Sequence, residues 1–93
     1  MAQALQPVEI EKELENLKGW IVEGDKLARQ FSFTDFREAM AFMVRVAFEA
    51  EELAHHPEFF NVYKDVKIQL ATHDAGGKIT EKDIALAKRI DAI

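Results

Sequence analysis

The chain contains neither glycine nor proline between Gly24 and Pro57, and this long uninterrupted segment constrains the fold most strongly. Thr34 with Asp35 supplies a helix cap and an acidic first turn, whereas Pro57 disfavours helical geometry at the residue before it. We therefore predict a long helix over about Asp35–Ala54. Its apolar residues spread well beyond one narrow stripe, so we expect two buried faces, one on a sheet and one on a neighbouring helix or a second subunit.

Two segments, one before and one after this helix, alternate apolar and polar residues in the way of strands with one buried face. The clearest alternation places Val66, Ile68, Leu70 and Thr72 on one side and Lys67, Gln69, Ala71 and His73 on the other. Turns at Gly24-Asp25 and Lys64-Asp65 would join each segment to a shorter neighbouring strand. Both pairs are therefore predicted to be antiparallel hairpins.

Two further helices complete the predicted order of elements. Apolar spacing and an acidic start indicate a first helix over about Pro7–Leu17, and Thr80 caps a last one, with Asp83 completing a weak capping box. The order helix, hairpin, long helix, hairpin, helix predicts an α+β two-layer sandwich. We expect a four-stranded antiparallel sheet with three helices on one face, in a single domain spanning residues 1–93.

Composition excludes several classes of function. With 48% hydrophobic and 31% charged residues the chain resembles a soluble globular protein, and its apolar stretches are too short to span a membrane. A net charge of -5 disfavours nonspecific binding to nucleic acid. The N-terminus lacks the basic region of a secretory signal, so we expect a cytoplasmic protein. Without cysteine, any chemistry must use histidine, carboxylate, lysine or backbone groups.

The three histidines are the strongest candidates for chemistry, because His55, His56 and His73 all lie next to predicted turns or loops. An imidazole exchanges a proton near neutral pH, since its ordinary pKa is about 6.5. Glu51 precedes His55 by four residues, so on one helix face its carboxylate would reach the imidazole and fix its tautomer. The competing structural interpretation is a cation placed at a helix C-terminus, where the dipole favours it.

A zinc site is the main chemical alternative, since three imidazoles can hold a catalytic metal with an open position. Adjacent histidines on a regular helix diverge by about 100°, although the break at Pro57 allows them to converge. We predict a site without metal or cofactor. Stoichiometric zinc after purification without a tag would favour the alternative.

The spacing of several of these residues resembles the signature of the pterin-4a-carbinolamine dehydratases. The pattern comprises Glu51, three residues, His55-His56-Pro57, five residues, Tyr63, nine residues, His73, nine residues and Asp83. The resemblance extends from Gly19-Trp20 through the final helix. It implies the same α+β fold and a homodimer or homotetramer.

The resemblance also implies an activity, namely the conversion of 4a-hydroxytetrahydrobiopterin to quinonoid dihydropterin and water during tetrahydrobiopterin regeneration. His55 and His73 would transfer protons, His56 would hold the substrate, and we hypothesise that Glu51 orients one of the histidines. The implied pterin contacts are His55, His56, Pro57, Phe59, Thr72, His73, Asp74 and Ala75.

A different class of function is an interaction module, because animal members of that family also serve as dimerisation cofactors for a homeodomain transcription factor. Such a protein would also enter the nucleus. The apolar outer face of the long helix suits either self-association or this partner. A third alternative is a stable domain that has lost its activity, which the complete set of histidines disfavours.

Overall fold

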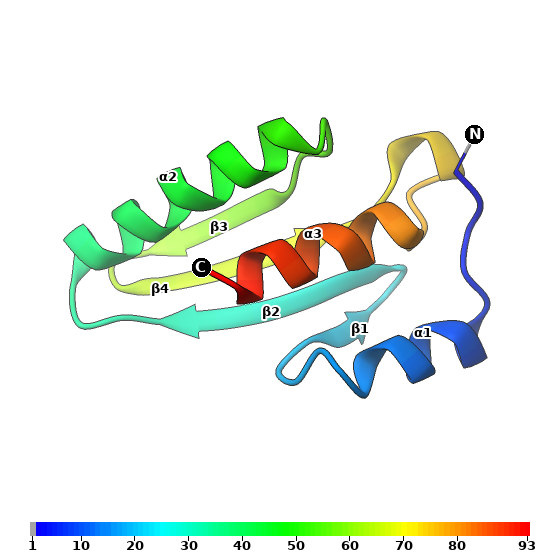
Figure 1. Cartoon of the computed structure of the whole chain (residues 1–93). Coiled ribbons are helices and arrows are strands. Elements are labelled where there is room, and N and C mark those ends of the chain that lie inside the picture. The colour runs from blue at the N-terminus through cyan, green and yellow to red at the C-terminus, as the bar shows by residue number, and fades with distance from the viewer. Residues whose placement is uncertain (1) are drawn as a thin grey trace.

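The computed structural model describes residues 2–93, and Figure 1 shows the course of the chain. The order of helices and strands, α-β-β-α-β-β-α, is the predicted one. The elements are α1 (Pro7–Leu14), β1 (Ile21–Glu23), β2 (Lys26–Ser32), α2 (Phe36–Glu52), β3 (Glu58–Val62), β4 (Asp65–Leu70), the short 3-10 helix η1 (His73–Ala75) and α3 (Glu81–Asp91).

The four strands form one antiparallel sheet in the order β1-β2-β4-β3. The two hairpins meet at the centre, where β2 pairs with β4 in a register that sets Leu27 opposite Leu70 and Phe31 opposite Val66. All three helices lie on the same side of the sheet (Figure 1). The α+β two-layer sandwich is therefore confirmed.

The core fills the space between the sheet and the helices α2 and α3. The predicted alternation along β4 is confirmed, because Val66, Ile68 and Leu70 are fully buried while the residues between them are half-buried. Packed against this face are buried side chains of the two helices: Ala39, Val46, Ala50, Ile84, Leu86, Ala87 and Ile90. This packing fixes the ends of α2, β4 and α3 relative to one another.

Three predicted boundaries were wrong by a few residues. Helix α1 ends at Leu14, three residues early, because the following residues form tight turns such as the one from the Leu17 amide to the Leu14 carbonyl. The second hairpin turns at Tyr63-Lys64 and not at Lys64-Asp65, since Asp65 already pairs with Val62. Tyr63 takes the positive φ of 51° that this turn requires.

Helix α2 stops at Glu52, earlier than predicted, through a left-handed cap. Ala54 has a φ of 52°, the Ala54 amide donates to the Glu51 carbonyl and the His55 amide donates to the Ala50 carbonyl. These two bonds are those of a Schellman motif, which ends a helix and redirects the chain. As a result, His55 no longer lies on the helix face that carries Glu51.

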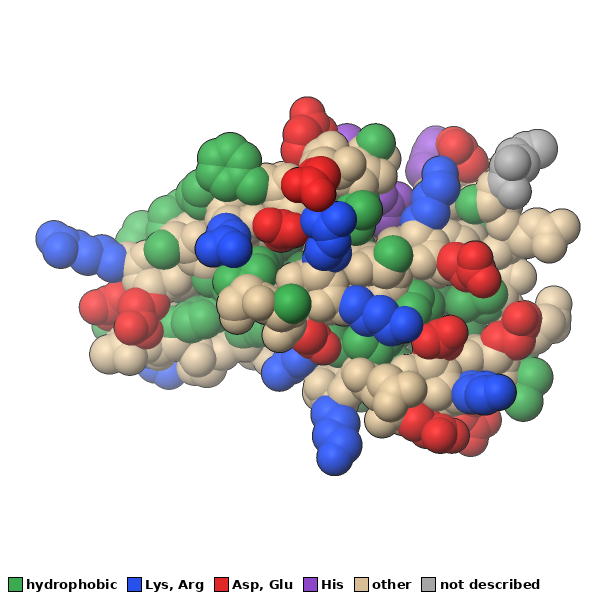
Figure 2. Space-filling view, in the orientation of Figure 1, with side chains coloured by type: hydrophobic (Ala, Val, Ile, Leu, Met, Phe, Trp, Pro, Cys, Tyr) green, Lys and Arg blue, Asp and Glu red, His purple; other side chains and the backbone are tan. Residues whose placement is uncertain are grey.

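The expected second apolar face of α2 is present but uncovered in the single chain. Phe36, Met40, Val44 and Phe48, which we call the α2 stripe, recur every four residues and are exposed. Figure 2 shows hydrophobic side chains at the surface over this helix. Edge strand β3 exposes Phe60 and Val62 as well.

No helix within residues 2–93 is both long enough and apolar enough to cross a membrane.

Candidate active site

All three histidines line one cavity of about 260 Å³ at the end of α2 and of β4. In Figure 2 the histidine side chains lie along one edge of the molecule. Among residues 2–93, the lining consists of Ala54, His55, His56, Ala71, Thr72, His73, Asp74 and Lys82. Segments that are far apart in the sequence therefore bring three imidazoles, one carboxylate and one ammonium group to a single hollow.

Local structure explains how each histidine reaches this cavity. His55 and His56 follow the left-handed cap of α2, which turns the chain away from the helix axis. His73 begins η1, directly after Thr72, the last residue with the buried parity of β4. His73 therefore lies just past β4, although the alternation had placed it on the polar side of the strand. His55 is buried, whereas His56 and His73 are exposed at the mouth of the cavity.

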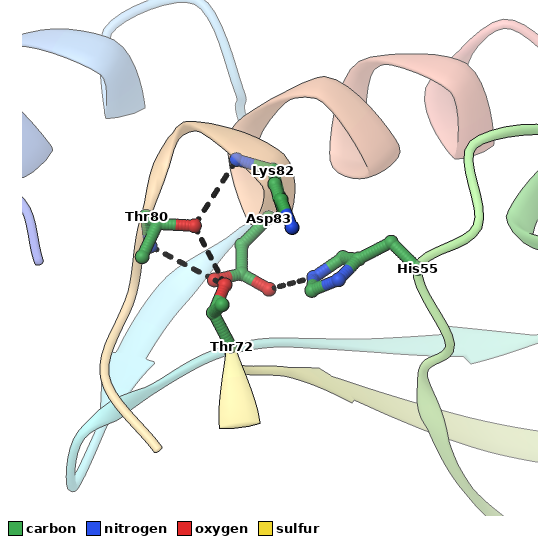
Figure 3. Close-up of polar contacts among 5 residues, drawn as sticks. All are labelled: His55, Thr72, Thr80, Lys82 and Asp83. Atoms are coloured by element: carbon green, nitrogen blue, oxygen red, sulfur yellow. Dashed lines mark hydrogen bonds and ion pairs between the residues drawn. The ribbon is translucent and has the colours of Figure 1, made fainter. Parts of the chain in front are cut away.

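The buried imidazole of His55 is held by a carboxylate from α3. Its Nε2 lies 2.5 Å from Oδ1 of Asp83, whose side chain is fully buried (Figure 3). The other carboxylate oxygen, Oδ2, accepts a hydrogen bond of 2.9 Å from the Thr72 hydroxyl and one of 2.9 Å from the Thr80 amide. The charge of Asp83 is thus met by three donors, as a buried carboxylate requires.

The partner of Nε2 determines the tautomer that is assigned to His55. An ionised carboxylate can only accept, so Nε2 of His55 must carry the proton that is donated to Asp83. In the neutral ring the lone pair is then on Nδ1, which is the one nitrogen able to take up a further proton. This arrangement matches a base whose orientation is set by a carboxylate partner.

A second chain of hydrogen bonds fixes the carboxylate itself. Because the Thr72 hydroxyl donates to Asp83, the 2.6 Å contact between the two threonine hydroxyls must have Thr80 as its donor. The Thr80 hydroxyl in turn accepts from the Lys82 amide (Figure 3). The expected capping box of α3 is therefore confirmed, and its acidic member also contacts His55.

The predicted pairing of Glu51 with His55 is wrong. Oε1 of Glu51 lies 2.8 Å from Nε2 of His56, because the cap of α2 has moved His55 away from this helix face. The side chains of the pair are 77% and 69% exposed, so water weakens their attraction. The hypothesis that Glu51 orients one of the histidines agrees with this geometry, and the histidine concerned is His56.

Some predicted contacts lie in this cavity and others do not. Thr72 and Asp74 line it together with the histidines, but Pro57, Phe59 and Ala75 are not among its lining residues. Phe59 lies within β3, opposite Ile68, on the side of the sheet that faces the helices. Its contact with substrate, like those of Pro57 and Ala75, stays a prediction.

Two residues of the site were missed. Asp83 had been interpreted through its capping box and its place in the spacing pattern, and neither feature indicates which histidine it contacts. Lys82 lines the cavity from the first turn of α3, beside Asp74. Lys82 immediately precedes Asp83, the last residue of the spacing pattern. Its place beside Asp83 in the sequence was therefore a detectable signal.

A metal site was the chemical alternative for these histidines. Within the part of the chain that the structure describes, no three His, Cys, Asp or Glu side chains are grouped so as to hold a metal ion. Independence from metal stays a prediction, to be tested by metal content and by activity in chelator.

Comparison with known proteins identifies the family to which this fold and this cavity belong. Residues 3–93 match the family described as pterin 4 alpha carbinolamine dehydratase. A protein of Opitutus terrae that carries the provisional name pterin-4-alpha-carbinolamine dehydratase is 55% identical over 93 residues, which cover 100% of this chain and 96% of the relative. A protein of Rhodopseudomonas palustris with the same provisional name is 52% identical, covering 100% and 93% of the two chains.

Solved structures agree with this assignment. The crystal structure of a transcriptional coactivator/pterin dehydratase from Brucella melitensis is 42% identical, covers 96% of each chain and superimposes with a TM-score of 0.89. A pterin dehydratase-like protein identified as a RuBisCO assembly factor in the alpha-carboxysome is 27% identical, with a TM-score of 0.62 over 78% of this chain and 83% of the other.

Fold and comparisons together define an enzyme of the hydro-lyase class. The chain belongs to the pterin-4a-carbinolamine dehydratase family, whose reaction is the dehydration of a pterin carbinolamine.

Proposed function

We propose that this chain dehydrates 4a-hydroxytetrahydrobiopterin to quinonoid dihydropterin and water by histidine acid-base catalysis, in the regeneration of tetrahydrobiopterin. The observation that supports this mechanism best is the gathering of His55, His56 and His73 around one cavity. The fixed tautomer of His55 supports it further. The protein would act in the cytoplasm.

The reaction requires two proton transfers and no redox step. The bond between carbon 4a and its hydroxyl breaks, and the hydroxyl leaves as water after it receives a proton. Nitrogen N5 loses its proton, and the electron pair of the N5–H bond forms the double bond between N5 and carbon 4a. One acid and one base therefore suffice, and positioned proton transfer typically contributes about 10² to 10⁴ in rate.

The base is assigned to His55, because its Nε2–H is held by Asp83 and its Nδ1 lone pair is left to accept the proton of N5. The negative charge of Asp83 then compensates the charge that the ring gains. His73, at the exposed side of the same cavity, would protonate the departing hydroxyl and recover its proton from water. His56 would hold the substrate, with its orientation set by Glu51.

Thr72 and Asp74 are the further substrate contacts that the cavity lining supports. A carboxylate such as that of Asp74 can accept hydrogen bonds from the amino and amide nitrogens of a pterin ring. Lys82 adds a donor for the ring carbonyl. The cavity thus offers groups that complement both the acceptors and the donors of the ring edge.

Self-association is the second part of the proposal. Exposed apolar surface that forms one continuous stripe is a common site of protein contact, and the α2 stripe has this character. Edge strand β3 also leaves one side of its backbone unpaired within the chain. We expect a homodimer or homotetramer. Because the relative from Brucella melitensis is described as a transcriptional coactivator as well as a dehydratase, a transcription factor is the second candidate partner.

A stopped-flow assay of carbinolamine dehydration in the presence of chelator tests the proposed activity. Dehydration well above the uncatalysed rate supports it. A rate equal to that of the uncatalysed reaction would refute it.

A further inference from the structure

A cavity of about 650 Å³ lies along β2, between α2 and the end of α3. Five consecutive residues of the chain at β2, 29–33, line it, so residues from both faces of the strand take part. Such a lining places the cavity at the edge of the strand and not on one face of the sheet. Within residues 2–93 it shares no lining residue with the histidine cavity.

This part of β2 has a neighbouring strand on one side alone. Within the described residues, β1 pairs with residues 26–28 of β2, whereas β4 pairs with residues 27–32 on the other side. Figure 1 shows β2 continuing past the short strand β1. Residues 29–32 therefore form an open edge of the sheet, which we call the β2 edge.

The turn before β2 determines which backbone groups point to the open side. A two-residue turn joins β1 to β2, so Glu23 and Lys26, which flank it, form a hydrogen-bonded pair. Lys26 thus directs its amide and carbonyl toward β1, and Gln30 and Ser32 direct theirs to the same side. The Phe33 amide agrees with this alternation, because it donates to the turn before β4, on the opposite side. Open donors and acceptors of this kind can pair with an added strand.

The cavity beside the β2 edge has an aromatic wall. Phe31, Phe33 and Phe42 are half-buried there. The ring centroids of Phe31 and Phe33 lie 4.7 Å and 4.9 Å from that of Phe42. An apolar side chain of an added strand would therefore find an apolar surface next to the backbone groups that pair with it.

Arg45 brings positive charge to the same cavity. Its side chain is 61% exposed and lies 3.8 Å from Glu49, whose other carboxylate oxygen accepts a shorter bond of 2.8 Å from Arg89. Asp91 also lines the cavity, but it is paired with Arg29 at 2.8 Å. Since the whole chain has a net charge of -5, an acidic partner is favoured here over most of the remaining surface.

We propose that the β2 edge binds an extended, acidic segment of a partner protein as an added strand. The backbone of this segment pairs with Gln30 and Ser32, an apolar side chain packs on the aromatic wall, and an acidic side chain meets Arg45. A second copy of the chain fits less well, because a symmetric interface would bring its own Arg45 to the same surface. The β2 edge shares no residue with the α2 stripe, so the two surfaces are distinct.

Calorimetric titration with synthetic peptides tests the charge preference. The acetylated octapeptide Thr-Phe-Thr-Glu-Thr-Phe-Thr-Glu should bind with a Kd below about 1 mM. Replacing both glutamates by lysine should weaken binding at least about tenfold, because lysine meets Arg45 with like charge. Arg45→Glu should reduce this difference to about threefold or less. Lys12→Glu, the matched control, makes the same change of charge on α1 and should preserve the difference.

N-methylated peptides test the strand pairing with the unaltered protein. Residues opposite Gln30 and Ser32 would be the threonines, whose side chains share the solvent-exposed face of the sheet and whose amides point at β2. Methylation of two threonine amides should therefore weaken binding about tenfold or more. Methylation of the amides of one phenylalanine and one glutamate, which point away from β2, should weaken it about threefold or less.

Substitution of Gln30 locates the binding on the protein. Gln30→Pro removes an amide that points to the open side and places a ring where the peptide would pair, so the variant should fold but bind at least about tenfold more weakly. Gln30→Ala keeps the amide and should bind like the unaltered protein. Thermal unfolding checks both variants. If Gln30→Pro does not fold, the methylated peptides decide the question.

Several results would overturn the proposal. One is the absence of peptide binding, and others are equal effects of the two methylation patterns or of Arg45→Glu and Lys12→Glu. Absence of peptide binding together with a lower mass of Gln30→Pro in sedimentation velocity would assign the β2 edge to a second copy instead.

Discussion

Nε2 of His55 and Oδ1 of Asp83 lie 2.5 Å apart, although 28 residues separate them in the chain. One residue follows the cap of α2 and the other belongs to the first turn of α3. Because Asp83 also bonds Thr72 at the end of β4, the contact joins three elements at the candidate active site. The packing of the helix pair on the sheet therefore also determines which ring nitrogen of His55 contacts Asp83.

Asp83→Asn should lower kcat by about 10- to 100-fold, the usual effect of removing a residue that orients a reactive imidazole. It should also lower the free energy of unfolding by about 1 to 3 kcal/mol, because an amide cannot satisfy all three buried donors. Stopped-flow kinetics and thermal unfolding measure the two effects. A positioning role further predicts that the pH profile of kcat changes. Normal kcat per folded molecule with an unchanged profile would leave Asp83 a purely structural role.

Glu51→Gln should have a much smaller effect than Asp83→Asn. The Glu51–His56 pair is mostly exposed, and such pairs contribute about 1 kcal/mol at most, so KM should rise by no more than about fivefold. Steady-state kinetics of the two variants side by side make the comparison. A fall in kcat as large as that of Asp83→Asn would contradict the role given to the exposed pair.

The sequence predicted the strands and the helix order well, because these depend on local periodicity. The alternation from Val66 to Thr72 indicated which side chains are buried, and the structure agrees. Which carboxylate contacts which histidine depends on the exact backbone conformation at the end of α2. Glu51 was expected to reach His55, but the positive φ of Ala54 ends α2 early and leaves His56 within reach instead. A left-handed alanine carries no clear sequence signal, since glycine is the usual residue there.

Gly19→Ala should destabilise the fold by about 1 to 3 kcal/mol. Gly19 has a φ of 92°, and a Cβ there would lie 2.8 Å from Nε of Arg29, whose guanidinium bonds Asp91 at the end of α3. Thermal or denaturant unfolding measures the change. Gly24→Ala is the matched control, because its φ is also positive but a Cβ there meets no atom within 4 Å. Equal losses in the two variants would show that crowding at Arg29 is unimportant.

Phe48→Glu should reduce the expected homodimer or homotetramer to a smaller species. Phe48 is 68% exposed in the single chain and belongs to the α2 stripe, so a buried carboxylate at that position would disfavour an interface. Sedimentation velocity of the variant and the unaltered protein gives the two masses. Gln30→Glu, which adds the same charge on an exposed residue of β2, should leave the mass unchanged. An oligomer that survives Phe48→Glu would exclude this part of the stripe from the interface.

The residues that sequence patterns could not assign are those whose roles arise from tertiary contact. Asp83 was visible as a capping residue, but its contact with His55 depends on how α3 packs beside α2. The histidines were recognisable because their types and spacing are unusual. A cavity of about 540 Å³ beside the histidines was not recognisable, because residues 2–5 and the start of α3 line it and no local pattern joins these segments.

The central claim is that His55 takes up the proton of N5 and that His73 donates a proton to the departing hydroxyl. Stopped-flow measurement of carbinolamine dehydration, with chelator present, should show fast turnover by the unaltered protein. His55→Ala and His73→Ala should each lower kcat by about 10² to 10⁴. A kcat that is unchanged in either variant would remove that histidine from the mechanism and contradict the account.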